Sequence, residues 1–134
     1  MIELHGWLTI VETYADEDLL TKDENKKIWQ KVKMILANNT CGLEIKFVNG
    51  TPFLNTLLCA NHRTTEVDEI IKTYTMISET AIGSYGAIYI RDDEDKTYNN
   101  EFQVYLFKRR KWEYKIDADF SPCIPTLEDD ILGN

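Results

Sequence analysis

Four consecutive carboxylates are the residues of this chain best placed to do chemistry. Asp92, Asp93, Glu94 and Asp95 follow the apolar run 86–90, with Arg91 between them. Carboxylate oxygens bind hard divalent cations, but this run lacks the alternate spacing, the central glycine and the closing glutamate of a calcium-binding loop. Adjacent like charges also repel one another. The run is therefore expected to be either a solvated turn between two strands or a surface that meets a basic partner.

A second acidic group, Glu128, Asp129 and Asp130, follows the proline-framed segment 121–125. The whole chain has 23 acidic and 15 basic residues and a formal net charge of -8. Nucleic acids and anionic membrane surfaces are bound mainly through Lys and Arg, so this charge disfavours both as partners. The two acidic groups together favour a docking surface for a basic protein.

Other reactive residues are sparse. The chain has two histidines, His5 and His62, and neither lies in a local nucleophile motif. A metal-dependent hydrolase that uses the acidic run and His62 is the main alternative function. A small-ligand site beside Trp7 and Tyr89 is a third possibility. No cofactor is expected.

The cysteines and the N-terminus indicate in which cellular compartment the protein is expected. Cys41, Cys59 and Cys123 are odd in number and widely spaced, which is a poor disulfide framework and fits reduced thiols. The N-terminus does not resemble a signal peptide, and no apolar run is long enough to cross a bilayer. We expect a cytoplasmic protein.

A strand is predicted at the start of the chain. Residues 2–13 alternate, with Leu4, Leu8 and Ile10 on the inner side and Trp7 on the outer side. Gly6 shares the inner side and leaves room for close packing. With 134 residues, 43% of them hydrophobic, the chain is expected to form one domain, 1–134.

The first helix is predicted to begin after Thr21, which lies three residues before Glu24, the spacing of a capping box. It should run to about Ala37. Trp29 is expected on its core side. The apolar residues on the core-facing side of this helix are Ile28, Val32, Ile35 and Leu36, which we call its inner stripe.

The second helix is predicted over residues 65–81. Thr65 precedes Asp68 with capping-box spacing, and Gly83 is expected to be the C-terminal cap. Its inner stripe is Val67, Ile70, Ile71, Tyr74 and Ile77.

A hairpin is predicted between the helices. Leu43, Ile45 and Phe47 alternate with polar residues, Asn49-Gly50 suits a tight turn, and residues 53–60 form the return strand. Two further strands, 85–91 and 101–108, are joined across the acidic loop. A basic turn at 108–111 leads to a last strand near 112–117.

This order of elements predicts an α+β fold: an antiparallel sheet of about six strands with two helices on one face, that is, a split βαβ, ferredoxin-like core with a C-terminal meander. The other face of the sheet would present Trp7 and Tyr89. The apolar segment from Pro122 to Leu127 is expected to cover that face.

Several blocks resemble the immunity protein 7 family of bacterial polymorphic toxin systems. They are residues 4–10, 61–63, 83–95, 100–104 and 121–126, so the resemblance runs from the first strand to the tail. It implies a small α+β protein, encoded beside a toxin secreted in competition between bacteria, that protects its own cell. The implied partner is a cognate toxin domain, expected to be basic, with nucleases as one candidate class. The resemblance implies no catalytic residue.

The charge pattern and the resemblance together predict a non-enzymatic inhibitor that occludes the active region of the toxin with an acidic surface. Surface charges would speed association, and aromatic anchors would slow dissociation. The residues expected to contact the toxin are Asp92, Asp93, Glu94, Asp95, Glu128, Asp129, Trp7 and Tyr98.

Overall fold

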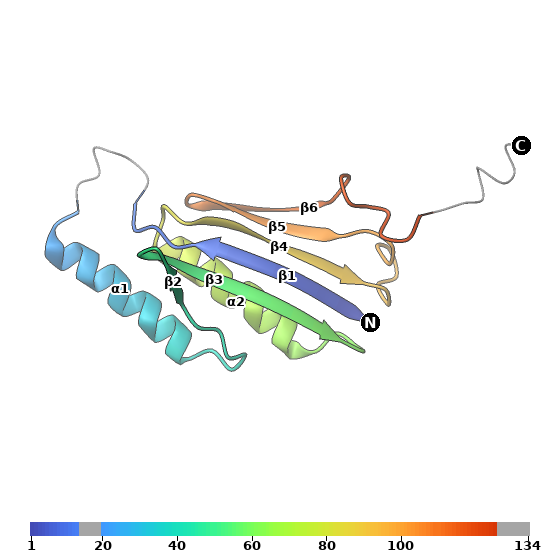
Figure 1. Ribbon diagram of the computed structural model, residues 1–134, viewed down its shortest axis with the longest axis horizontal. Helices are drawn as coiled ribbons and strands as arrows, with labels where there is room; N and C mark the ends of the chain where they lie inside the picture. The colour runs from blue at the N-terminus through green and yellow to red at the C-terminus, as the bar shows by residue number, and fades with distance from the viewer. Residues whose placement is uncertain (14–19, 126–134) are drawn as a thin grey trace, which may run out of the picture.

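A six-stranded antiparallel sheet covered on one face by two helices forms the fold (Figure 1). The computed structural model describes residues 1–13 and 20–125. The strand order is β2-β3-β1-β4-β5-β6. The strands are β1 (Ile2–Thr9), β2 (Lys46–Val48), β3 (Thr51–Ala60), β4 (Tyr85–Asp92), β5 (Gln103–Lys108) and β6 (Lys111–Ile116), and the helices are α1 (Lys22–Ala37) and α2 (Thr65–Thr80). The predicted α+β class is confirmed, with β5 and β6 as the appended meander.

The first helix begins as its sequence predicts. Thr21 Oγ1 accepts a hydrogen bond from the amide of Glu24, and Glu24 Oε1 accepts one from the amide of Thr21, at 3.1 and 3.3 Å. Val32 is fully buried, and Trp29 packs partly buried against the core with its indole donating to Glu12 at 2.6 Å. The remaining members of the predicted stripe, Ile28, Ile35 and Leu36, are partly buried against the core.

The second helix has the predicted stripe and its predicted bounds to within one residue, but its capping residues differ from the prediction. Its N-cap is Thr64, which makes no side-chain cap, so the predicted capping box of Thr65 and Asp68 is wrong. The carboxylate of Asp68 instead accepts a hydrogen bond from Arg63 Nη2 at 2.7 Å.

No helix within residues 1–13 and 20–125 is long and apolar enough to cross a membrane.

The prediction that Gly83 caps α2 is also wrong, because the C-cap is Ala81. Gly83 is needed for a close approach of two chain segments. A Cβ added there would overlap the carbonyl of Thr13, and its amide donates to the carbonyl of Val11 at 2.9 Å.

The core lies between the sheet and the helices. Ile2, Leu4 and Leu8 on β1 are fully buried. Gly6 lies between them and leaves room for Tyr74 of α2, since a Cβ at residue 6 would come within 3.0 Å of the phenol oxygen. That oxygen is 2.7 Å from Thr56 Oγ1, and burial raises the pKa of Tyr74 to about 12.

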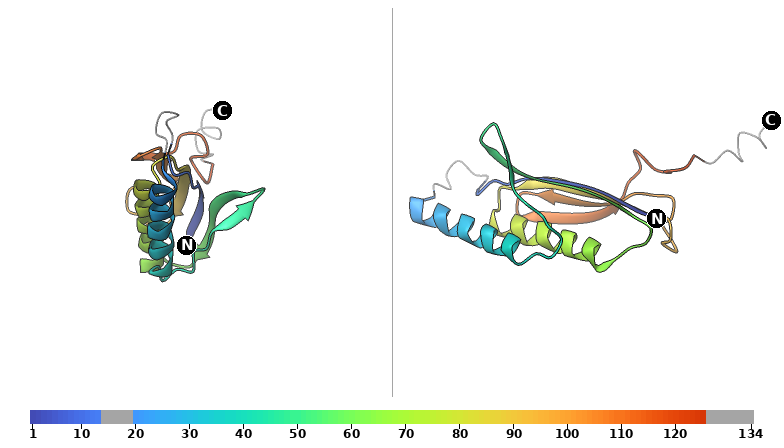
Figure 2. Two further views of the ribbon diagram at one scale, coloured as in Figure 1. Left: turned by 90° about the vertical axis from the view of Figure 1, so that its left-hand side faces the viewer. Right: turned by 60° about the horizontal axis from the view of Figure 1, so that its bottom comes forward.

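The hairpin turn is confirmed, because Asn49 and Gly50 have φ of 51° and 77°. However, β2 has only three residues, and it pairs only with Thr51–Phe53. The hairpin projects away from the helices (Figure 2). Phe47 therefore has 68% of its surface exposed.

Candidate functional site

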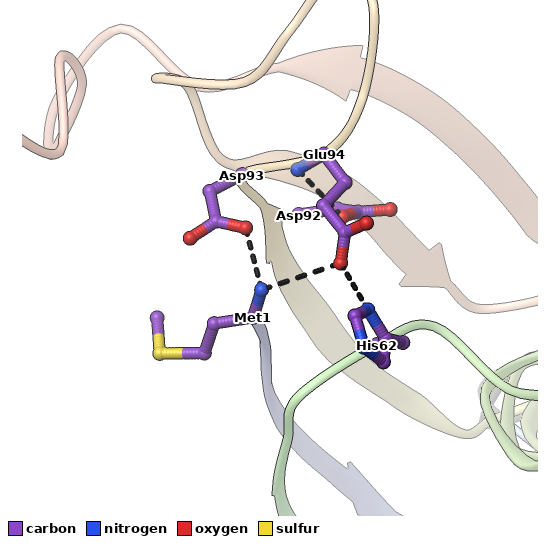
Figure 3. Close-up of polar contacts among 5 residues, drawn as sticks. All are labelled: Met1, His62, Asp92, Asp93 and Glu94. Atoms are coloured by element: carbon purple, nitrogen blue, oxygen red, sulfur yellow. Dashed lines mark hydrogen bonds and ion pairs between the residues drawn. The ribbon is translucent and has the colours of Figure 1, made fainter.

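The acidic run lies where the end of β4 meets the start of β1 (Figure 3). Because the two strands are antiparallel, Asp93 follows directly beside Met1, and its amide donates to the carbonyl of Met1 at 3.2 Å. The amino group of Met1 is 2.5 Å from Asp93 Oδ1 and 3.6 Å from Glu94 Oε1. His62 Nδ1 approaches the same Glu94 oxygen at 2.5 Å. Two segments that are distant in sequence, the start of β1 and the segment around His62, thus converge on this loop.

The four carboxylates have different environments. Asp92 is buried, with 7% of its surface exposed, and accepts a hydrogen bond from the amide of Glu94 at 3.0 Å. Asp95 is half-buried and accepts hydrogen bonds from the amides of Thr97 and Tyr98. The side chains of Asp93 and Glu94 keep 40% and 53% exposure. These two carboxylates face the solvent.

The hydrogen bonds favour the ionised state of this loop. The bond from the Met1 amino group lowers the pKa of Asp93, and the contact with His62 lowers the pKa of Glu94. The amide of Tyr98, followed by that of Thr97, lowers the pKa of Asp95. The bond to Asp93 in turn raises the pKa of the Met1 amino group.

The residues named for the hydrolase alternative do not assemble a metal site. Within residues 1–13 and 20–125, no group of three or more His, Cys, Asp or Glu side chains is placed to hold a metal ion. Asp92 and Asp95 direct carboxylate oxygens to backbone amides, and His62 contacts Glu94. The arrangement is a hydrogen-bonded loop with two exposed carboxylates.

The two aromatic candidates lie apart from each other. Trp7 is 46% exposed on the face of the sheet opposite the helices, and its ring meets that of Tyr85 edge-on with centroids 6.2 Å apart. Tyr98 is 36% exposed in the loop that follows the acidic run. Glu128 and Asp129, also expected to contact the toxin, lie outside the described residues.

The segment after β6 covers one end of the helix-free face. The carboxylate of Asp117 accepts hydrogen bonds from the amides of Phe120 and Asp119 and from the Ser121 hydroxyl. Phe120 packs against Tyr89 with centroids 6.0 Å apart. The amide of Cys123 donates to the carbonyl of Asn100 at 2.8 Å. The contact over Tyr89 thus comes from Phe120, which precedes the segment 122–127 predicted to cover this face, and cover by that segment stays a prediction.

The other end of this face, around Trp7, is exposed. Leu57 of β3 is 74% exposed and aligns with His5 of β1, and Tyr85 of β4 is 39% exposed and aligns with Thr9. Sequence reasoning missed Leu57 and Tyr85 as surface residues. Alternation within each strand assigns its residues to the two faces of the sheet. It does not give the register between strands, which places Leu57 and Tyr85 near Trp7.

One comparison with known proteins gives a match. The sequence model of a family described as Immunity protein 7 matches residues 1–129. Neither a curated protein nor a solved structure is similar enough to match the chain.

Proposed function

This chain belongs to the immunity protein 7 family, and we propose that it neutralises its cognate toxin by forming a stoichiometric complex that covers the toxin's active region. Membership of the family implies toxin neutralisation by a non-enzymatic inhibitor. The match over residues 1–129 is the observation that carries this proposal, because it spans every described helix and strand.

Negative charge supports association with a basic toxin domain. Asp93 and Glu94 are exposed at one end of the sheet. Their carboxylates contact the amino group of Met1 and the imidazole of His62. Segments 14–19 and 126–134 contain six carboxylates and no Lys or Arg, so they account for six of the eight excess negative charges. Charges of one sign on an inhibitor accelerate its encounter with an oppositely charged partner.

Exposed aromatic side chains support the lifetime of the complex. Trp7 and Tyr98 each present a large ring to solvent, and aromatic residues with polar atoms dominate the binding energy of many interfaces. Trp7 also lies beside Leu57 and Tyr85 on the uncovered part of the sheet. We assign Trp7 as the principal anchor and Tyr98 as an anchor next to the acidic loop.

Co-expression with the toxin domain encoded beside this chain tests the proposal. Cells should survive when both proteins are made and die when the toxin is made alone. The purified proteins should elute together in a 1:1 complex on size-exclusion chromatography at low salt. Cell death despite abundant inhibitor, or separate elution of the two proteins, would refute the proposal.

A further inference from the structure

The outer edge of β3 is mostly uncovered. Strand β2 pairs with Thr51–Phe53 alone, whereas β3 continues to Ala60 (Figure 1). Residues 54–60 have β1 on one side and, within residues 1–13 and 20–125, no strand on the other. This open stretch is about 20 Å long at the usual rise of a strand.

The register identifies which backbone groups face this edge. Ile10 aligns with Pro52 when the β1–β3 register is continued, and its amide donates to the carbonyl of Pro52 at 3.0 Å. In an antiparallel pair, alternate residues exchange hydrogen bonds with the partner strand. The residues that bond β1 are therefore Leu54, Thr56, Leu58 and Ala60.

The residues between them, Asn55, Leu57 and Cys59, consequently direct their N–H and C=O groups away from β1. Within the described part of the chain, none of these six groups has a hydrogen-bond partner. They form a ladder that an extended backbone can complete.

A groove runs along this edge. Its other sides are formed by residues 41–43, by Thr64 and Glu66, and by Ile70 of α2. A strand added about 4.8 Å from β3 would direct alternate side chains towards Leu43 and Ile70, which are buried. Its other side chains would lie beside Leu57.

The edge lacks the usual protection against pairing. Strand β6, at the opposite edge of the sheet, carries Lys111, Glu113 and Lys115, and charged side chains on an edge strand discourage pairing with other chains. Residues 54–60 of β3 carry no charge. Leu57 is also the most exposed large apolar side chain in the described residues. An open edge with these properties is a site for strand addition.

We infer that the toxin contributes an extended segment that adds to the sheet as a strand beside residues 54–60 of β3. This inference rests on the proposed function. A second copy of the chain is a poorer occupant, because two molecules of net charge -8 repel each other. A second copy would also bring its own residues 41–43 against the same groove, whereas an extended segment adds the width of one strand.

Hydrogen–deuterium exchange followed by NMR tests the inference on the unmodified chain. In the free protein, the amides of Asn55, Leu57 and Cys59 should exchange fast. In the complex with the toxin domain, their exchange should slow by about a hundredfold or more. Trp112 and Tyr114 of β6 are the internal reference, since their amides face the other edge and should exchange equally fast in both samples.

Two substitutions at one residue separate backbone from side-chain effects. Leu57→Pro removes an amide that faces the edge without removing a bond to β1, and Leu57→Ala keeps that amide while shortening the side chain. Once circular dichroism shows that both variants are folded, Leu57→Pro should bind the toxin at least about tenfold more weakly than Leu57→Ala.

Two results would overturn the inference. One is a 1:1 neutralising complex in which the three amides still exchange fast, an outcome that leaves the proposed function intact. The other is slow exchange of these amides in the free chain. If a second copy caused it, the exchange rates would depend on protein concentration, and if the chain itself caused it, they would not. Absence of any complex would instead refute the proposed function.

Discussion

The amino group of Met1 lies 2.5 Å from Oδ1 of Asp93, and this ion pair links the start of β1 to the loop that follows β4. The same amino group is 3.6 Å from Glu94, which also contacts His62. Both carboxylates remain exposed, so the ion pair orders this loop while leaving its charge accessible to a partner. In solution, exposed pairs of this kind contribute little to stability, and their effect is better measured by titration.

Acetylation of the amino terminus should therefore raise the pKa of Asp93 towards its ordinary value. The amino group has a raised pKa, so its contribution is present below its unfolded pKa and is lost as the pH rises through the folded value. Asp93 has a lowered pKa, so its contribution is lost as the pH falls. The pair thus operates between about pH 4 and pH 8. Carboxyl NMR titration measures the shift, and an unchanged Asp93 after acetylation would contradict it.

Neutralising the exposed part of the acidic loop should slow association with the toxin. We expect the double substitution Asp93→Asn and Glu94→Gln to lower the association rate constant about three- to tenfold at low salt, with little change in the dissociation rate. The matched control is Glu44→Gln with Glu79→Gln, which removes the same charge elsewhere. Stopped-flow measurements at about 0.02 and 0.5 M salt test this, because screening should remove the difference. Equal slowing by both pairs would show that only net charge matters.

Removing the ring of Trp7 should shorten the lifetime of the complex. Trp7→Ala is expected to speed dissociation by about tenfold or more, as loss of a buried aromatic anchor does. Trp112→Ala is the control, since Trp112 is 48% exposed, close to the 46% of Trp7, but lies on β6 with its ring beside Tyr105. Surface plasmon resonance gives both dissociation rates. Similar rates for the two variants would exclude Trp7 as the anchor.

The carboxylate of Asp117 should stabilise the fold above acidic pH. Burial alone would raise its pKa, but hydrogen bonds from Phe120, Asp119 and Ser121 outweigh burial and lower the pKa. The stabilisation is therefore present above the unfolded pKa and is lost as the pH falls through the folded value.

At pH 7, Asp117→Ala should lower the free energy of unfolding by about 1–3 kcal/mol, the usual contribution of hydrogen bonds to a charged group. Urea denaturation at pH 7 and pH 3 measures the effect, which should shrink at the lower pH. Asp119→Ala is the control, because Asp119 is exposed and contributes its backbone amide. A loss of stability that is independent of pH would contradict the assignment.

Gly86 should tolerate no side chain. A Cβ at residue 86 would overlap the backbone of Trp7 on the neighbouring strand, so Gly86→Ala is expected to cost about 3 kcal/mol or more. Gly42→Ala is the comparison, because Gly42 has φ of 72° but free space around it. Its cost should be about 1–2 kcal/mol, the strain of a left-handed residue. Thermal and urea unfolding rank the two variants, and equal losses would contradict the steric explanation.

Local signals in the sequence predicted most of the fold. The capping box of Thr21 and Glu24 and the Asn49-Gly50 turn each depend on residues within four positions of one another, and both are confirmed. Strand alternation correctly assigned Leu4 to the core and Trp7 to the opposite face. These patterns need no knowledge of distant segments.

Most of the errors arose where a distant segment decides the outcome. Gly83 fits a capping pattern, but the position needs glycine because the carbonyl of Thr13 lies against it. The error at Asp68 is local, since its carboxylate accepts a hydrogen bond from Arg63, five residues earlier, and does not cap the helix. The acidic run gave no sign that Asp92 would be buried or that the amino terminus would pair with Asp93. Those features follow from the alignment of β1 with β4, which the sequence does not encode locally.

The alternation of the central strands separates the residues that build the core from those proposed to contact the toxin. Side chains that point towards the helices build the core, and those that point the other way, such as Trp7 and Leu57, leave the core untouched when they change. In the proposed complex, outward-pointing residues could therefore be replaced one at a time to fit a different toxin while the core is kept.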